Sequence, residues 1–280
     1  MSKNLSSVAQ QEFDSMVHHL YQSDGRLRNA VTLRSGVVGD IYKFRTMGKG
    51  LANQKASQAD VTPMDVAHSL VNCVLENWNA PEYTDIFDQA EVNFDEKSQL
   101  AKTIAMAIRR REDQLIIDAL DSATPTATIP VATGGADSGL NVAKLRAAGA
   151  ALDNNGVPEE GRIFVGNTRS KWTLLGETEA TSSDYNTVKA LVNGSIDTFA
   201  GFKFFWIADN TEGGISEAAG DIYSNYAFHM DSIGLAVGID LRTEINYVAE
   251  KTSWLCNGLY KAGAVAIDES GIVEVLCDET

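Results

Sequence analysis

Apolar residues along this chain follow several spacings, which predict helices, strands and one long excursion between them. Residues 8–21 carry an apolar stripe at helical spacing, which predicts a short amphipathic helix. Residues 31–62 combine β-branched residues, glycines and basic residues with few large apolar ones. This texture is typical of a hairpin-like excursion that buries little of itself, and its length indicates a functional reason or a partner surface. Residues 64–78 then fit either a returning strand or a helix.

The clearest element is a long helix in the middle of the chain. Asn93 and Glu96 have the spacing of a capping box, which marks a helix start. Apolar residues then recur at helical spacing as Leu100, Ile104, Ile108, Leu115 and Ala119. The pattern predicts a helix over 94–120, about 40 Å long at 1.5 Å per residue. A helix of this length is expected to span the whole subunit.

The second half of the chain has the texture of α/β structure, and we find no internal repeat in the sequence. Pro125, Pro130 and the Gly-rich residues 132–139 predict a flexible linker that ends the long helix. The expected elements after it are a helix at 141–153, a strand at 162–166, one or two helices within 168–191, and a strand at 201–210. The final third is expected to be rich in strands.

Composition adds that the chain can bury a sizeable core and gives no sign of membrane insertion. The 280 residues are 44% hydrophobic, and no run approaches the roughly 18 apolar residues that a membrane span needs. The first residues, "MSKNLSSVAQQEFD", have no secretory pattern. Three widely spaced cysteines argue against a disulfide framework or a zinc site, so a reducing cytoplasm is the expected compartment.

Charge is strongly negative overall but unevenly distributed. The formal net charge of −15 disfavours ordinary binding to nucleic acid. Residues 26–55 nevertheless hold seven basic residues against Asp40 alone, a local +6, whereas residues 209–280 hold thirteen acidic and three basic residues, a local −10. Two solvated faces would explain this, and so would a basic segment that meets the acidic region of another copy.

No group of residues in the sequence forms a recognisable catalytic, metal or cofactor site. The stretch "GGADSG" lacks the Gly-Lys-Ser/Thr ending of a phosphate-binding loop, and no Gly-x-Ser-x-Gly elbow occurs. His18 and His19 are adjacent, so on a helix they point about 100° apart and make poor joint metal ligands. His68 and His229 are isolated. We therefore predict no enzyme activity and no cofactor.

The turn "NNGVPEEGRIFVG", residues 154–166, is the stretch most suggestive of chemistry. Glu159 and Glu160 are adjacent carboxylates, but two side chains on one turn tend to point apart. Pro158 presets φ for a turn between a helix and a strand. We therefore expect a structural turn in which Arg162 forms a salt bridge to one of the two glutamates.

The order of these parts resembles the major capsid proteins of tailed bacteriophages, which have the Hong Kong 97-type fold shared with herpesvirus shells. The resemblance covers nearly the whole chain and rests on "YQSDGRLRNAV", "ALDNNGVPEEGRIFVGN" and the closing "SWLCNGLYKAGAVAIDESGIVEV". It implies an α+β fold of the Hong Kong 97 type, with an N-terminal arm, an extended β-hairpin loop, a long spine helix in a peripheral domain and an α/β axial domain.

The resemblance also implies a division of the chain into parts. It assigns 1–30 to the arm, 31–80 to the extended loop, 81–129 and 226–280 to a peripheral domain with its spine helix at 94–120, and 130–225 to the axial domain. The extended loop would then lie on a neighbouring subunit. The intersubunit contact candidates are its basic residues Arg34, Lys43, Arg45, Lys49 and Lys55.

The function that the resemblance implies is self-assembly into hexamers and pentamers of an icosahedral head, which encloses double-stranded DNA without sequence-specific binding. The implied partners are further copies of the chain, a separate scaffolding protein, a portal protein and a decoration protein, with no membrane. The chain would reside in the virion capsid after assembly in the host cytoplasm. The alternatives are an encapsulin-type nanocompartment shell and, in another class, a soluble α/β enzyme with an unrecognised site.

Overall fold

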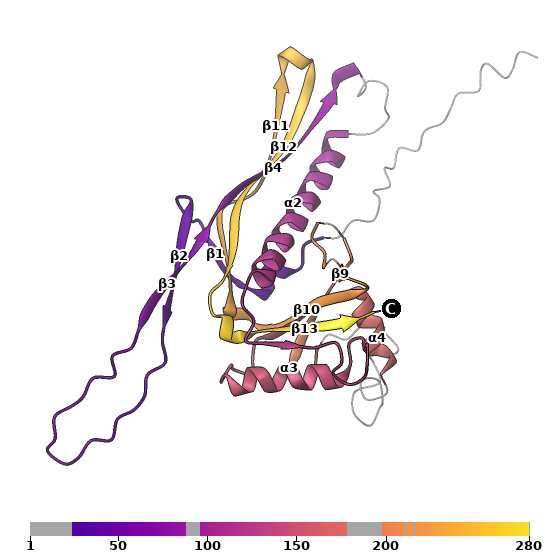
Figure 1. Ribbon diagram of the computed structural model, residues 1–280. Coiled ribbons are helices and arrows are strands. Elements are labelled where there is room, and N and C mark those ends of the chain that lie inside the picture. The colour runs from indigo at the N-terminus through magenta and orange to yellow at the C-terminus, as the bar shows by residue number, and fades with distance from the viewer. Residues whose placement is uncertain (1–23, 88–95, 178–197, 211, 216, 280) are drawn as a thin grey trace, which may run out of the picture.

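A computed structural model describes residues 24–87, 96–177, 198–210, 212–215 and 217–279. The fold is mixed α+β, with helices α2 (Glu96–Asp121), α3 (Val142–Asn154) and α4 (Thr168–Gly176) and with strands in three sheets (Figure 1). Helix α2 confirms the helix predicted over 94–120 from Glu96 onward. Residues 94 and 95, and the helix predicted at 8–21, lie outside the described residues.

The first sheet is long and narrow and lies against α2 (Figure 1). Its strand order is β1 (Thr32–Ser35), β11 (Ile233–Val248), β12 (Ser253–Ala266) and β4 (Glu76–Asp85), so β4 is an edge strand. Strands β11 and β12 form an antiparallel pair, whereas β1 joins β11 in parallel. A Cβ on Gly258 of β12 would lie 2.4 Å from Ile104 Cγ2, so the missing side chain lets α2 pack directly against the strand.

The second sheet has seven strands and is covered on both faces. Its order is β5 (Ala127–Ile129), β13 (Ile272–Asp278), β10 (Ile222–His229), β6 (Arg162–Asn167), β8 (Phe202–Ile207) and β7 (Thr198–Phe199), with β9 (Glu217–Ala219) also paired to β10. Side chains of β6 alternate between two cores, because Ile163 joins the core that contains α2 and Phe164 joins the core that contains α3 and α4. Every residue of β6 is therefore buried.

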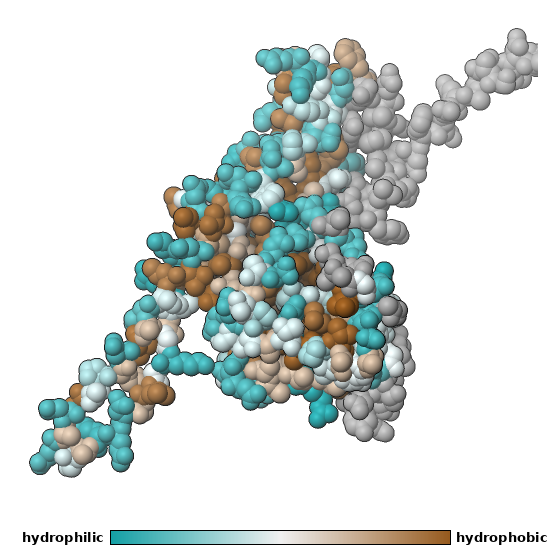
Figure 2. Space-filling view, viewed as in Figure 1, coloured by the Kyte–Doolittle hydropathy of each residue, from teal (hydrophilic) through white to brown (hydrophobic). Residues whose placement is uncertain are grey.

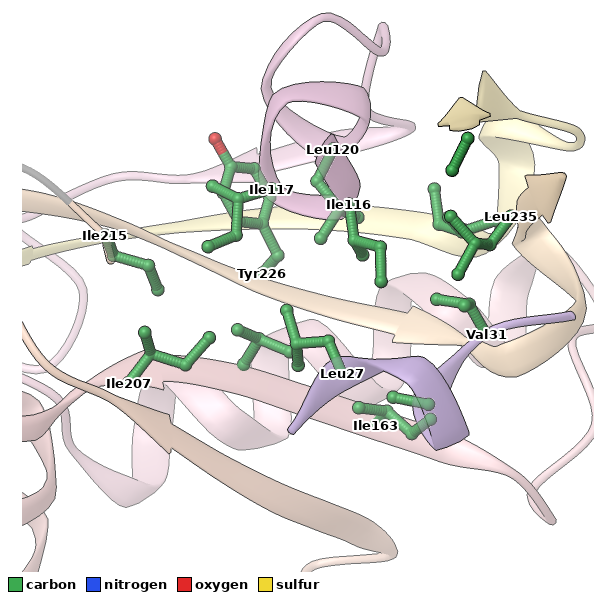
Figure 3. Close-up of a cluster of buried hydrophobic side chains, with 14 of the residues drawn as sticks. Leu27, Val31, Ile116, Ile117, Leu120, Ile163, Ile207, Ile215, Tyr226 and Leu235 are labelled. Atoms are coloured by element: carbon green, nitrogen blue, oxygen red, sulfur yellow. The ribbon is translucent and has the colours of Figure 1, made fainter. Parts of the chain in front are cut away.

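A short N-terminal segment lies between the long helix and the second sheet. The 3₁₀ turn η2 (Leu27–Ala30) inserts Leu27, which is fully buried, and Val31 follows it into the same core. Figure 3 shows the two side chains among Ile116 and Leu120 of α2, Ile163 of β6, Ile207 of β8 and Leu235 of β11. Residues from distant parts of the chain thus share one core.

The stretch predicted as a flexible linker does end the long helix, but it is ordered, so the predicted flexibility is wrong. Strand β5 lies within it and pairs in parallel with β13. The Ser138 hydroxyl then donates to the Val131 and Thr133 carbonyls, and the fully buried Lys144 donates from Nζ to the Leu276 carbonyl at 2.9 Å. A strand of three residues is too short to show a periodicity, and its partner strand is remote in sequence.

The remaining predicted elements agree with the structure wherever it describes them. Residues 64–78 return as strands, β3 (His68–Val74) followed by β4, which settles the choice between strand and helix. Helix α3 and strands β6 and β8 fall at the predicted places, and α4 begins the predicted helical stretch, of which residues 178–191 are not described. The final third is strand-rich as expected. Among the described helices, none combines the length and the apolarity needed to traverse a bilayer.

The contact at Gly258 leads to a prediction on stability. Gly258→Ala places a methyl group against Ile104 and Ile108 of α2, so we expect the free energy of unfolding to fall by about 1–3 kcal/mol. Gly176→Ala, at the open end of α4, is the matched control and should change stability by less than about 0.5 kcal/mol or raise it slightly. Urea denaturation measures both variants. Equal midpoints for the two would contradict the close packing of α2 on β12.

Candidate assembly surface

The most unusual surface of the chain belongs to a two-stranded hairpin that projects from the body (Figure 1). It consists of β2 (Ile41–Met47) and β3, paired in antiparallel register, and of the hairpin tip, residues 48–67, between them. Nearly every side chain of the hairpin tip is exposed. A segment of this length with so little burial gains little stability from its own contacts, which favours a partner surface.

The base of the hairpin is fixed to the first sheet by packing. Phe44 is buried with Cys73, Leu75 and Ala236 in a small separate core. A Cβ on Gly234 of β11 would lie 2.5 Å from Phe44 Cζ, so the absence of a side chain there makes the seat for the phenyl ring. The direction in which the hairpin leaves the body is therefore set by close packing.

Polar contacts reinforce this base. The Leu75 N–H donates to the Asp40 carbonyl at 2.8 Å, and Lys261 Nζ of β12 lies 2.6 Å from Asp40 Oδ1. The hydrogen bond from Lys261 holds the pKa of Asp40 below its ordinary value. A Cβ on Gly263 would overlap the Val74 carbonyl, so only glycine allows the hairpin to cross β12 at this point.

One face of the hairpin is both apolar and basic. The register pairs Lys43 with Asn72 and Arg45 with Leu70, all on the side turned away from the Phe44 core. We call this side the outer hairpin face; it comprises Ile41, Lys43, Arg45, Met47, His68, Leu70, Asn72 and Val74. Met47 is 71% exposed and Val74 60% exposed. Figure 2 shows hydrophobic side chains beside hydrophilic ones along the hairpin.

The candidate contact residues are distributed over three places. Lys43 and Arg45 share the outer hairpin face, and within the described part of the chain neither forms an ion pair. Arg34 is exposed on β1 of the first sheet, and Lys55 is exposed in the hairpin tip. Lys49 donates from Nζ to the Asn155 carbonyl at 3.1 Å, so it contacts the body of its own chain. Their role between subunits stays a prediction.

The distal half of β11 offers exposed apolar and acidic side chains at the far end of the first sheet. Ile245 is 43% exposed and Tyr247 is 46% exposed. Glu250 follows them in an exposed turn. Glu244 lies in the same stretch and pairs with Arg242 at 2.5 Å. This surface belongs to the acidic final third of the sequence.

The N-terminal segment is attached to α2 by two adjacent buried carboxylates. Asp113 accepts hydrogen bonds from the backbone N–H groups of Arg26 and Leu27 at 2.9 Å each. Glu112 pairs with Arg28 at 3.3 Å, and the same guanidinium contacts Asp240 of β11 at 2.8 Å. Burial raises the pKa of both Glu112 and Asp113, whereas the hydrogen bond from Arg28 lowers the pKa of Asp240. A cavity of about 400 Å³ adjoins this cluster.

The turn at 154–166 is structural, but the predicted salt bridge is wrong. Arg162 is buried and pairs with Asp153 of α3 at 2.5 Å, and it also donates to the Val157 and Pro158 carbonyls. Glu159 and Glu160 are exposed, and among the described residues Arg162 has no other acidic partner. The chain reverses after α3 and thereby brings Asp153 back to the first residue of β6.

Metal-ligating and nucleophilic side chains do not converge in the described part of the chain. No three His, Cys, Asp or Glu side chains there form a group that could hold a metal ion. Cys73, Cys256 and Cys277 are separate, reduced and buried. Burial raises the pKa of Cys73 to about 11 and that of Cys277 to about 12, which disfavours the reactive thiolate at neutral pH.

Several residues that build this surface were not identified from the sequence. Phe44, Gly234 and Gly263 form the hairpin base, and Asn155 receives the contact from Lys49. Isolated glycines within strand patterns such as "SIGLAVG" and "YKAGAVA" often mark a close approach of another backbone, which is the signal that could have located the base.

Comparison with solved structures places the fold among the shells of viruses and related particles. The head of the Helicobacter pylori bacteriophage KHP40 has a TM-score of 0.81 at 10% identity, with 99% of this chain and 98% of that chain covered. The capsid of the cyanophage P-SCSP1u has a TM-score of 0.77 at 16% identity, with 99% and 95% covered. The capsid of a native GTA particle has a TM-score of 0.71 at 14% identity, with 98% and 97% covered.

The sequence itself identifies the family. The family described as phage capsid protein matches residues 5–279, nearly the whole chain. No curated protein matches the sequence significantly. The chain therefore belongs to the phage capsid protein family and is a structural protein of a viral capsid, with the Hong Kong 97-type fold.

The buried Glu112 generates a prediction on pH dependence. Because burial raises its pKa above the ordinary value of 4.5, the folded chain binds this proton more tightly than the unfolded chain does. The stability that protonation of this group contributes is therefore full below pH 4.5 and is lost as pH rises through the raised pKa. Glu112→Gln removes the titration, so its stability relative to the wild type should be higher at pH 8 than at pH 4.5.

Thermal unfolding at the two pH values measures this difference. Asp240→Asn serves as a control with the opposite sign, because the pKa of Asp240 is lowered and its contribution is lost as pH falls. A difference between Glu112→Gln and wild type that does not change with pH would show that Glu112 keeps an ordinary pKa.

Proposed function

We propose that copies of this chain assemble into the hexamers and pentamers of an icosahedral head that encloses double-stranded DNA. The observation that carries the proposal is the family match over residues 5–279 of a chain whose hairpin presents exposed apolar side chains. Exposed apolar surface of this kind in a soluble chain marks a contact with a partner. The match to phage capsid proteins favours a viral head over an encapsulin-type compartment or a soluble enzyme.

We propose the division into parts that the resemblance implies. In it, 1–30 form the arm, 31–80 the extended loop, 81–129 and 226–280 the peripheral domain, and 130–225 the axial domain. Strands β1 and β4 attach both ends of the extended loop to the sheet of the peripheral domain, which supports its role as a projection from that domain. The length of α2 and its packing along the first sheet support its assignment as the spine helix.

We propose that the outer hairpin face docks on a neighbouring copy, with the distal half of β11 as the complementary surface. Lys43 and Arg45 bring positive charge beside exposed apolar side chains, and the β11 surface brings Ile245 and Tyr247, with Glu250 in the turn that follows the strand. The two surfaces differ, so the contact is heterologous and propagates from copy to copy until a ring closes. Complementary charge of this kind sets register and partner choice.

The electrostatics of the chain support the enclosure of DNA without specific binding. A net charge of −15 makes the subunit repel phosphate backbones on average. A wall that does not hold the DNA allows it to be packed densely. The resemblance further supports a separate scaffolding protein, a portal protein and a decoration protein as partners, and assembly in the host cytoplasm.

Imaging of the expressed chain tests the proposed assembly. We expect shells in negative-stain micrographs when the chain is produced together with its scaffolding protein. A soluble enzyme would give monomers or small oligomers under every condition, and that result would sink the proposal. Shells that co-purify with a cargo enzyme in place of DNA would favour the encapsulin-type compartment.

Charge reversal on the outer hairpin face tests the docking. Lys43→Glu together with Arg45→Glu should leave the subunit folded, because both side chains are exposed, and should abolish or strongly reduce shell formation. Circular dichroism checks the fold, and sedimentation measures the shells. Lys203→Glu, an exposed basic residue of the axial region, is the matched control and should assemble normally. Normal shells from the double variant would contradict docking through this face.

A compensating change tests which surface receives the hairpin. Glu250→Lys should restore part of the assembly that Arg45→Glu removes, because the reversed pair is again complementary. The same sedimentation measurement applies to the single and double variants. If Arg45→Glu loses assembly and Glu250→Lys does not restore it, the hairpin still contacts a neighbouring copy. That result would contradict the assignment of β11 as the surface that receives it.

A further inference from the structure

A single hydrogen bond connects the far part of the hairpin with the body of its own chain. Lys49 Nζ donates to the Asn155 carbonyl at 3.1 Å. Among the described residues, no other hydrogen bond or ion pair joins the hairpin tip to residues outside the hairpin. The position of the tip relative to the body therefore depends on the hairpin base and on this one contact.

The acceptor of this bond is held rigidly. Helix α3 ends in a Schellman motif, in which the Val157 N–H donates to the Leu152 carbonyl at 3.1 Å and Gly156 adopts a φ of +72°. The Asn155 side chain donates to Thr126 Oγ1 at 2.7 Å and to the Ser270 carbonyl at 2.8 Å. Its carbonyl therefore has a fixed position and orientation.

The location of the acceptor also favours a lysine electrostatically. Asn155 is the C-cap of α3, where the unpaired carbonyls carry the negative end of the helix dipole. A positively charged side chain stabilises this end. Asn155 belongs to the turn at 154–166, in which Arg162 pairs with Asp153. This turn is therefore a rigid support for the hairpin.

The other basic residues of the hairpin behave differently. Lys43 and Arg45 point away from the body and form no ion pair in the described part of the chain, so they are available to a partner. Lys55 is exposed in the tip. Lys49 alone among these residues contacts the body of its own chain.

We propose that Lys49 and Asn155 form a self-contact that holds the hairpin against the body in the unassembled subunit and is given up when the hairpin docks on a second copy. Lys49 is then a positioning residue that limits assembly, in contrast to Lys43 and Arg45, which promote it. Only the release of the self-contact on docking rests on the proposed function, because the self-contact itself exists in the isolated chain.

A distance measurement on unassembled subunits tests the self-contact directly. Spin labels are placed on cysteines introduced at Ser57 in the hairpin tip and at Glu159 in the turn, both exposed. In wild type, pulsed electron paramagnetic resonance should give a distance distribution dominated by one short-distance population. Lys49→Ala should broaden it and increase the population of longer distances by about two- to fivefold, as expected for a charge at a helix terminus.

Lys55→Ala is the matched control for the distance measurement, because it removes another lysine from the same tip and should leave the distribution unchanged. An unchanged distribution in Lys49→Ala would overturn the self-contact. This measurement does not require shells, so it decides the question even if the chain fails to assemble under every condition and the proposed function falls.

Assembly kinetics test the second half of the proposal. The concentration at which shells first form should be lower for Lys49→Ala than for wild type, by about two- to fivefold, because the hairpin no longer has to leave its self-contact. Lys43→Ala and Arg45→Ala should raise that concentration. A rise in Lys49→Ala as well would make Lys49 an intersubunit contact and overturn the proposal.

Discussion

The insertion of Leu27 and Val31 between α2 and the second sheet is the packing interaction on which the rest of the subunit depends. The long helix has one apolar side, and part of it faces the first sheet through Ile104 and Ile108. Its last turns instead reach over the second sheet, where Ile116 and Leu120 meet the N-terminal segment. Without that segment, two elements that are remote in sequence would face each other across a void, which is costly in a close-packed core.

The same segment explains why charged residues lie beneath the helix. Backbone N–H groups at the start of η2 have no acceptors within the turn, and the Asp113 carboxylate accepts their hydrogen bonds. Glu112 then needs a counter-ion because it is also buried, and Arg28 provides one while reaching Asp240. Desolvation of the two carboxylates is the cost of holding a polar backbone at this place. The cluster thus joins the N-terminal segment, α2 and β11 in a single arrangement.

How much of this could be read from the sequence depends on how far apart the contacting residues are. Helix α2 follows from its own spacing of Leu100, Ile104 and Ile108, and the apolar run of β6 and the strand-rich end of the chain are likewise local patterns. Strand β5 was missed because its partner β13 is remote in sequence. The Arg162–Asp153 pair was mispredicted because the path of the turn after α3 decides which nearby carboxylate faces the guanidinium, and residue spacing does not report that path. For the hairpin, charge and composition predicted an exposed basic excursion. The packing of Phe44 against Gly234 and the contact of Lys49 with Asn155 could not be predicted, because in each case the two residues are far apart in sequence.

The edge position of β4 has a consequence for a protein whose copies form a capsid shell. An exposed edge strand of ten residues offers backbone donors and acceptors to any other strand, which is the usual route to fibrous aggregation. Pro81 lies within this strand, opposite Asn257, and has no N–H to donate outward. The row of donors is interrupted at that point, so strand addition is disfavoured. Association of copies is then directed to side-chain surfaces, which can form closed rings. It is directed away from backbone pairing, which can add strands without limit.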